Sequence, residues 1–164
     1  SETSHYAASV LCDELNKFRS QVQKMYTGMQ QEGEEETDYE EMMLDYMNSV
    51  LSQKVFTTLE QTKYVKMLEE ATESLYRKNR ERIFVKQYEG LCLRLLELKK
   101  FPETEKWCRR LVQQHGNTLE AYPCQLKLYF TMGEREKFFQ VMQELKQSDV
   151  IIDNETLELI RTFS

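Results

Sequence analysis

The residues of this chain that offer a thiol or an imidazole to a metal ion are four cysteines and two histidines. The cysteines are Cys12, Cys92, Cys108 and Cys124. No two of them form a CxxC pair, and neither His5 nor His115 lies near such a pair, whereas a zinc site needs clustered ligands. Each cysteine falls within an apolar helical pattern. We therefore expect small buried side chains in a reducing compartment, and no metal or other cofactor.

No arrangement of residues typical of catalysis is visible. The sequence has no glycine-rich phosphate loop, no HExxH motif and no nucleophile elbow, and neither histidine belongs to an acid–base pattern. The carboxylates of EGEEETDYEE, residues 32–41, are too crowded for a catalytic pair and lack the ligand spacing of an EF-hand. We expect a chain that is not an enzyme, with an acidic loop that leads into a helix.

Composition and charge favour an all-α protein that binds neither nucleic acid nor a membrane. The 164 residues include only 5 Gly and 2 Pro, and the apolar-periodic stretches are rich in Glu, Lys, Leu, Met and Gln. The net charge of -6 argues against direct nucleic-acid binding. No apolar run approaches the roughly 20 residues of a membrane span, and no signal peptide is visible, so we expect a cytoplasmic location. Because the chain starts without Met, we expect part of a longer protein.

Residues 1–56 predict an N-terminal helical hairpin. Its first helix, about residues 4–31, carries apolar side chains at alternating spacings of 4 and 3, which is a heptad seam. Such a seam suits either a helix packed on its own domain or the contact of a homodimer. The seam consists of Leu11, Leu15, Phe18, Val22, Met25 and Met29.

Two capping boxes and a basic run organise the middle of the chain. Thr37–Glu40 and Thr58–Gln61 each predict a helix start, and Leu59 belongs to the apolar stripe of the later helix. The basic run YRKNRER, residues 76–82, suits either phosphate contacts or pairing with the acidic loop. Pairing is the favoured interpretation, because the run has no interleaved aromatic residues.

Residues 85–118 and 119–152 resemble each other at a shift of 34 positions. Both copies contain a helix, a tight turn, a second helix and a break, and a helix–turn–helix period of 34 is typical of tetratricopeptide repeats. We therefore expect a tetratricopeptide-like α-α superhelix over residues 57–164, preceded by the helical extension. The apolar pairs include Tyr88 with Tyr122, Leu95 with Tyr129, Trp107 with Val141 and Leu111 with Leu145.

The turns of the two copies use the residues that end and begin helices. Pro102 suits the first turn of a helix, and Gly133 suits a left-handed residue after one. HGN, residues 115–117, is expected to close the first copy in the same way. Trp107 should fill the space between neighbouring helices. Asp153 or Asn154 should cap a last helix that covers the final repeat.

The stretch YEGLCLRLLELKKFPETEKWCRRLVQQHGNTLEAYPCQLKLYFTMGEREKFFQVMQELK, followed by NETLELIRTF, resembles the bacterial transcriptional activator domain. That domain is a tetratricopeptide-like module of antibiotic-regulatory-type transcriptional regulators, and the resemblance covers about residues 84–164. Two features depart from the family. Residues 1–56 do not predict a winged-helix DNA-binding domain, and the usual alanine of the second helix is Thr104 in one copy and Phe138 in the other.

The resemblance and the repeats together predict a protein-interaction and oligomerisation module. Its partner would be a protein, either a second copy or a different chain, and its contacts would lie on the first helices of the repeats. Alternatives are a generic tetratricopeptide scaffold of another signalling protein and, less favoured, a pentatricopeptide-like RNA-binding fragment, which needs many units and a basic face. The candidate contacts, which equally suit a core, are Tyr88, Tyr122, Gln125 and Tyr129.

Overall fold

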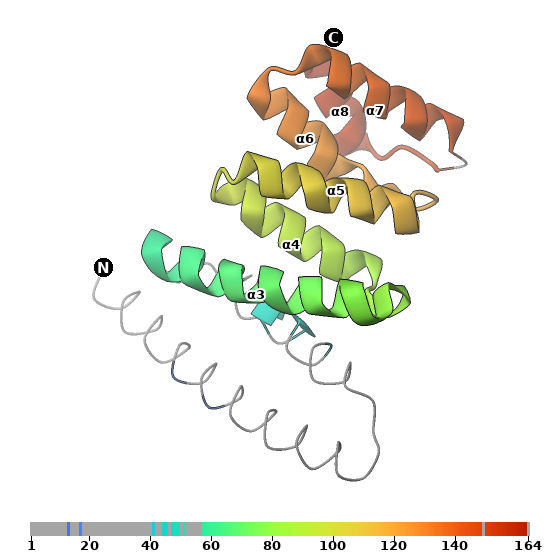
Figure 1. Ribbon diagram of the computed structural model, residues 1–164. Helices are drawn as coiled ribbons and strands as arrows, with labels where there is room; N and C mark the ends of the chain where they lie inside the picture. Colours follow the sequence, from blue (N-terminus) through green and yellow to red (C-terminus); the bar gives the residue numbers. More distant parts are fainter. Residues whose placement is uncertain are drawn as a thin grey trace. The chain divides into compact units, whose positions relative to one another are not determined.

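The computed structural model describes residues 13, 17, 41, 44–45, 47–49, 51, 57–148 and 150–163 (Figure 1). Every regular element in these ranges is a helix, as the composition predicts. Cys12, the seam residues between positions 11 and 29 and the predicted Thr37–Glu40 cap lie outside the described residues. The chain forms two compact units, residues 1–87 and 88–164, and each is described by itself below.

In the first unit, α3 (Thr58–Asn79) begins with a capping box one residue earlier than predicted. The hydroxyl of Thr57 accepts a hydrogen bond from the Glu60 amide at 3.2 Å, and the Glu60 carboxylate accepts one from the Thr57 amide at 3.3 Å. This pair also places a negative charge in the first turn, where the helix dipole favours it. Because of this register, Leu59 is 81% exposed and does not belong to the buried stripe, contrary to the prediction.

The basic run around η1 (Arg80–Arg82) pairs with acidic and aromatic side chains of the first unit. Arg82 forms an ion pair with Glu41 at 2.6 Å, and Glu41 belongs to the acidic stretch, so the favoured interpretation of pairing holds there. Arg77 pairs with Glu73 at 3.4 Å, and the Arg80 guanidinium lies 4.0 Å from the centre of the Tyr76 ring. Each of these three arginines therefore has an acidic or aromatic partner within the first unit.

The second unit contains a succession of helices and one short 3-10 turn, and their order recurs along the chain. Its elements are α4 (Val85–Glu97), which starts just before the unit boundary, α5 (Phe101–His115), η2 (Leu119–Ala121), α6 (Pro123–Met132), α7 (Arg135–Gln147) and α8 (Asn154–Phe163). The starts of α4 and η2 are 34 positions apart, and so are those of α5 and α7. Figure 1 shows α4 to α7 running back and forth as successive hairpins.

The two hairpin turns have the same backbone conformation at equivalent positions. Lys99 (φ 58°) and Gly133 (φ 70°) both adopt the left-handed conformation, and Pro102 lies in the first turn of α5; the glycine and the proline are as predicted. Gly116, by contrast, has φ -64° and does not end α5 in a left-handed conformation, so that expectation is wrong. A Cβ at Gly116 would lie 2.6 Å from the Val112 carbonyl oxygen, and close approach is therefore what requires glycine there.

The core of the second unit is centred on Trp107. Its side chain is fully buried on α5, with the Tyr88 ring centre 6.2 Å away, and the Tyr88 ring in turn lies 5.8 Å from the His115 ring. Thr104 and Phe138, which occupy equivalent positions of the two copies, are also fully buried. One copy therefore places a small side chain where the other places an aromatic ring, so the two hairpins are packed differently.

The last helix, α8, begins at the cap that the sequence predicts. The carboxylate of Asp153 accepts a hydrogen bond from the Thr156 amide at 2.9 Å. Hydrogen bonds from Thr156 lower the pKa of the Asp153 carboxyl, so the ionised cap is favoured. α8 packs against α6. Among the described helices, none combines the length and the apolar character needed to cross a bilayer.

Candidate functional site

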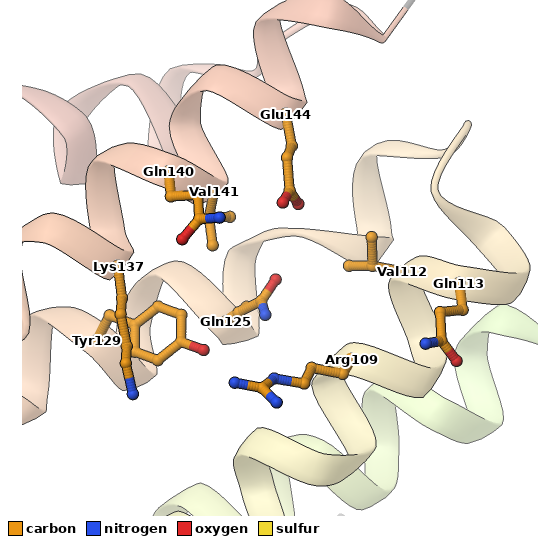
Figure 2. A pocket seen from close by; sticks show the side chains of 9 residues that line it. All are labelled: Arg109, Val112, Gln113, Gln125, Tyr129, Lys137, Gln140, Val141 and Glu144. Atoms are coloured by element: carbon orange, nitrogen blue, oxygen red, sulfur yellow. The ribbon is translucent and has the colours of Figure 1, made fainter.

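A polar groove of about 320 Å³ lies between α5, α6 and α7. Figure 2 shows side chains from all three helices that converge on it. The lining combines three amides, two cations, one carboxylate, one phenol and two valines. These residues are Arg109, Val112 and Gln113 of α5, Gln125 and Tyr129 of α6, and Lys137, Gln140, Val141 and Glu144 of α7.

Gln125 lies at the centre of the groove lining. It belongs to the first turn of α6, and this helix is buried on most sides because it packs against α5, α7 and α8. Its side chain is only 5% exposed, and among the described residues its carboxamide oxygen has no hydrogen-bond donor. In Figure 2 this side chain stands between Arg109 and Glu144. A buried acceptor without a donor costs free energy, which a bound donor would recover.

A charged network fixes the side of the groove next to Tyr129. The Tyr129 hydroxyl donates a hydrogen bond to the Glu105 carboxylate at 2.8 Å, and the Lys137 ammonium lies 3.4 Å from the same oxygen. Arg109 lies 3.6 Å from the other carboxylate oxygen. Glu105 thus connects one residue of each groove helix, and it holds both cations close to the groove.

The pKa values of Tyr129 and Glu105 are shifted in opposite directions. Burial raises the pKa of Tyr129 to about 12, and its hydrogen bond to Glu105 and the negative charge of that carboxylate add to the effect. Burial also acts to raise the pKa of Glu105, but the hydrogen bonds from Tyr129 and Lys137 and the charge of Arg109 outweigh it and lower the pKa. Near neutral pH the phenol is therefore a fixed donor to an ionised carboxylate.

The structure separates the four candidate contacts of the first helices into two pairs. Gln125 and Tyr129 line the groove. Tyr88 is fully buried against Trp107, and the buried Tyr122 donates its hydroxyl hydrogen bond to the Gly116 carbonyl. Tyr88 and Tyr122 share a repeat position that faces the interior of the helix pairs, and so both serve the core.

The residues that the second helices contribute to the groove are absent from the sequence-based prediction. Lys137, Gln140, Val141 and Glu144 are spaced by 3, 1 and 3 positions, which places them on one face of α7. The same spacing is visible in the sequence. The sequence-based prediction places the contacts on the first helix of each pair and therefore does not include these residues.

A second group of residues that the sequence-based prediction leaves apart is a cluster of three thiols. The sulfur atoms of Cys92, Cys108 and Cys124 all lie within 4.8 Å of one another, and the three side chains are buried and unbridged. They come from α4, α5 and α6. The sequence correctly predicts buried cysteines here, but it treats them as unclustered, since only the packing of three helices brings them together.

The described residues define the class of this protein as an all-helical chain with a polar groove between two helical hairpins. Comparison of the chain with protein-family models, with curated proteins and with solved structures finds no match. The function is therefore inferred from the groove and the thiol cluster.

Proposed function

We propose that this chain is a non-enzymatic protein-interaction module of the tetratricopeptide-like kind, and that its groove binds an extended segment of a partner protein. The observation that carries the proposal is the Gln125 carboxamide, which is buried in the groove with its oxygen lacking a donor among the described residues. A peptide backbone N–H is the donor that such an amide recognises irrespective of sequence.

The chemistry of the groove lining favours a segment that carries an acidic side chain. Arg109 and Lys137 stand beside the groove and share one carboxylate, Glu105. The carboxylate of the lining itself, Glu144, stands on the far side of Gln125 from Arg109 (Figure 2). The positive charge is therefore concentrated at the Arg109 end of the groove. Gln113 and Gln140 offer further amide contacts, and Val112 offers an apolar one. A volume of about 320 Å³ is at the small end of the roughly 300–1,000 Å³ range of ligand pockets, which suits a short segment.

The repeated hairpin supports the wider assignment. The helix starts and the two left-handed turns recur at one constant interval, which is the period expected of a tetratricopeptide-like module. The resemblance of residues 84–164 to the bacterial transcriptional activator domain makes a bacterial transcriptional regulator the proposed parent protein. In such a regulator the groove would receive a segment of a second copy or of another protein.

Selection of peptides on the groove tests the proposal. A phage-displayed heptapeptide library is selected on the whole chain, and enriched peptides are synthesised with a fluorophore for anisotropy titrations. We expect enrichment of Asp or Glu, and at least tenfold weaker binding to Gln125→Leu and to Arg109→Glu. The first variant leaves the buried peptide N–H without an acceptor, which costs about 1–3 kcal/mol, and the second removes a charged hydrogen bond worth about 1.5–3 kcal/mol. The matched control is Gln143→Leu, because Gln143 is an exposed glutamine of α7 outside the groove lining.

The competing outcomes are distinct. Peptides that bind wild type, Gln125→Leu and Gln143→Leu equally would refute the groove as the binding site. A dimer seen by light scattering in wild type and Gln143→Leu but absent in Gln125→Leu would identify the occupant as a second copy. A salt-sensitive gel shift with single-stranded RNA would favour the pentatricopeptide-like alternative instead.

A further inference from the structure

We propose that Cys92, Cys108 and Cys124 form a three-thiolate site for a monovalent copper ion. This site is separate from the peptide groove and does not depend on its function. The three sulfur atoms lie within 4.8 Å of one another, each on a different helix, and all three cysteines are free. Cys92 and Cys108 are fully buried and Cys124 is 2% exposed.

The number and the spacing of the sulfur atoms favour copper(I). In a trigonal shell with metal–sulfur bonds of about 2.3 Å, the sulfurs stand about 4.0 Å apart, so small side-chain shifts close the cluster around an ion. Structural zinc takes four ligands, and among the described residues this cluster offers three. Thiolates select soft ions, and copper(I) accepts three of them. Each thiol that coordinates the ion releases its proton to solvent.

An acidic pocket provides an entry path to the cluster. Cys124 lines a pocket of about 340 Å³ formed by α4, η2, α6 and α8. Its other lining residues include four carboxylates, of which one pairs with the only lysine of the lining, Lys127–Glu155 at 3.4 Å. The carboxylates outnumber the lysine, and this excess of negative charge raises the local concentration of cations at the entrance. The other three carboxylates are Glu89, Glu120 and Asp153.

The fold favours Cys124 as the first ligand. It is the one cysteine of the cluster that lines the acidic pocket, and it lies in the first turn of α6, where the helix dipole favours a negative charge. The thiolate is the form of cysteine that binds a metal ion, so this position suits the first bond to the ion.

Competition with a chelator measures the proposed site. The reduced whole chain is titrated anaerobically with copper(I) against bathocuproine disulfonate, and the retained metal is counted by mass spectrometry after desalting. We expect one copper ion per chain and a copper X-ray absorption spectrum with three sulfur ligands. Replacement of Cys92, Cys108 or Cys124 by Ser should weaken binding at least tenfold, whereas Cys12→Ser should leave it unchanged.

Several results would overturn the assignment. These are loss of copper from wild type to the chelator, retention by Cys124→Ser equal to that of wild type, loss of binding in Cys12→Ser, or zinc(II) bound as tightly as copper(I). Circular dichroism reports whether each serine variant folds. If the variants do not fold, thermal unfolding of wild type decides, because copper(I) bound to the folded cluster must raise the Tm and an unchanged Tm excludes the site.

Discussion

Lys99 and Gly133, which occupy equivalent positions of the two hairpins, end their helices with the same pair of backbone hydrogen bonds. Lys100 donates to the Leu95 carbonyl at 3.0 Å, and Glu134 donates to the Tyr129 carbonyl at 2.9 Å. The left-handed residues themselves donate to the carbonyls of Leu96 and Phe130, at 2.9 and 3.1 Å. Both turns are therefore complete Schellman motifs, but only one has the glycine that the conformation favours. The lysine copy carries backbone strain.

This strain predicts opposite effects of substitution at the two turns. Lys99→Gly should stabilise the chain by up to about 1 kcal/mol, because it removes the Cβ clash of a left-handed residue at a smaller cost in unfolded-state entropy. Gly133→Ala should destabilise it by about 1 kcal/mol. Urea unfolding monitored by circular dichroism measures both. The control is Lys100→Gly, at a residue with φ -85°, which should lower stability; a stabilising Lys100→Gly would contradict the explanation.

Local patterns in the sequence predict the helix boundaries well, because the responsible interactions are local. Pro102, Gly133 and the Asp153 cap each act within a few residues of their own positions, and the structure places them as expected. The predicted cap of α3 is one position too late because Thr57–Glu60 and Thr58–Gln61 fit the same motif. That shift also explains the exposure of Leu59.

The candidate site could be predicted only in part, because it depends on tertiary packing. The sequence suggests Gln125 and Tyr129, but the hydrogen bond from Tyr129 to Glu105 crosses between helices and has no local signal. Similarly, Cys92 and Cys108 lie on different helices, and nothing in their spacing along the chain shows that their sulfur atoms meet. Repeat periodicity predicts which elements are neighbours, and side-chain contacts decide which residues touch.

Gly116 provides a test of close approach without backbone strain. Gly116→Ala should destabilise the chain by about 1–3 kcal/mol, because the new Cβ would press on the Val112 carbonyl oxygen at 2.6 Å and on the Tyr122 hydroxyl at 3.3 Å. Thermal or urea unfolding measures the loss. Asn117→Ala, at the exposed neighbouring residue, is the control and should change stability by less than about 0.5 kcal/mol. Equal effects of the two substitutions would contradict the steric account.

Tyr129→Phe should destabilise the chain by about 1 kcal/mol near neutral pH, because it removes the hydrogen bond to Glu105. The difference in stability between wild type and Tyr129→Phe should become smaller at alkaline pH. The pKa of Tyr129 is raised from its ordinary value of 10.0 to about 12, so the unfolded chain loses this proton first. The contribution is therefore complete below pH 10 and is lost as the pH rises toward 12. Urea unfolding of both proteins across this range should show the difference shrinking; a constant difference would refute the linkage.

The stability that Glu105 contributes should be lost in acid, whereas that of Tyr129 is lost in alkali. Its pKa is lowered below the ordinary 4.5, because the hydrogen bonds from Tyr129 and Lys137 and the charge of Arg109 outweigh the burial of the carboxyl group. The folded chain therefore holds the ionised form more strongly than the unfolded chain does. This contribution is complete above pH 4.5 and is lost as the pH falls through the lowered pKa. Glu105→Gln should remove this contribution, so the stabilities of wild type and variant should converge as the solution is acidified, as measured by urea unfolding.

Glu103→Gln is the control on the same helix, because Glu103 takes no part in the network around Tyr129. Its difference in stability from wild type should not follow that of Glu105→Gln. A Glu105→Gln variant whose difference from wild type stays constant through this range would show that the carboxylate network contributes no linked stability.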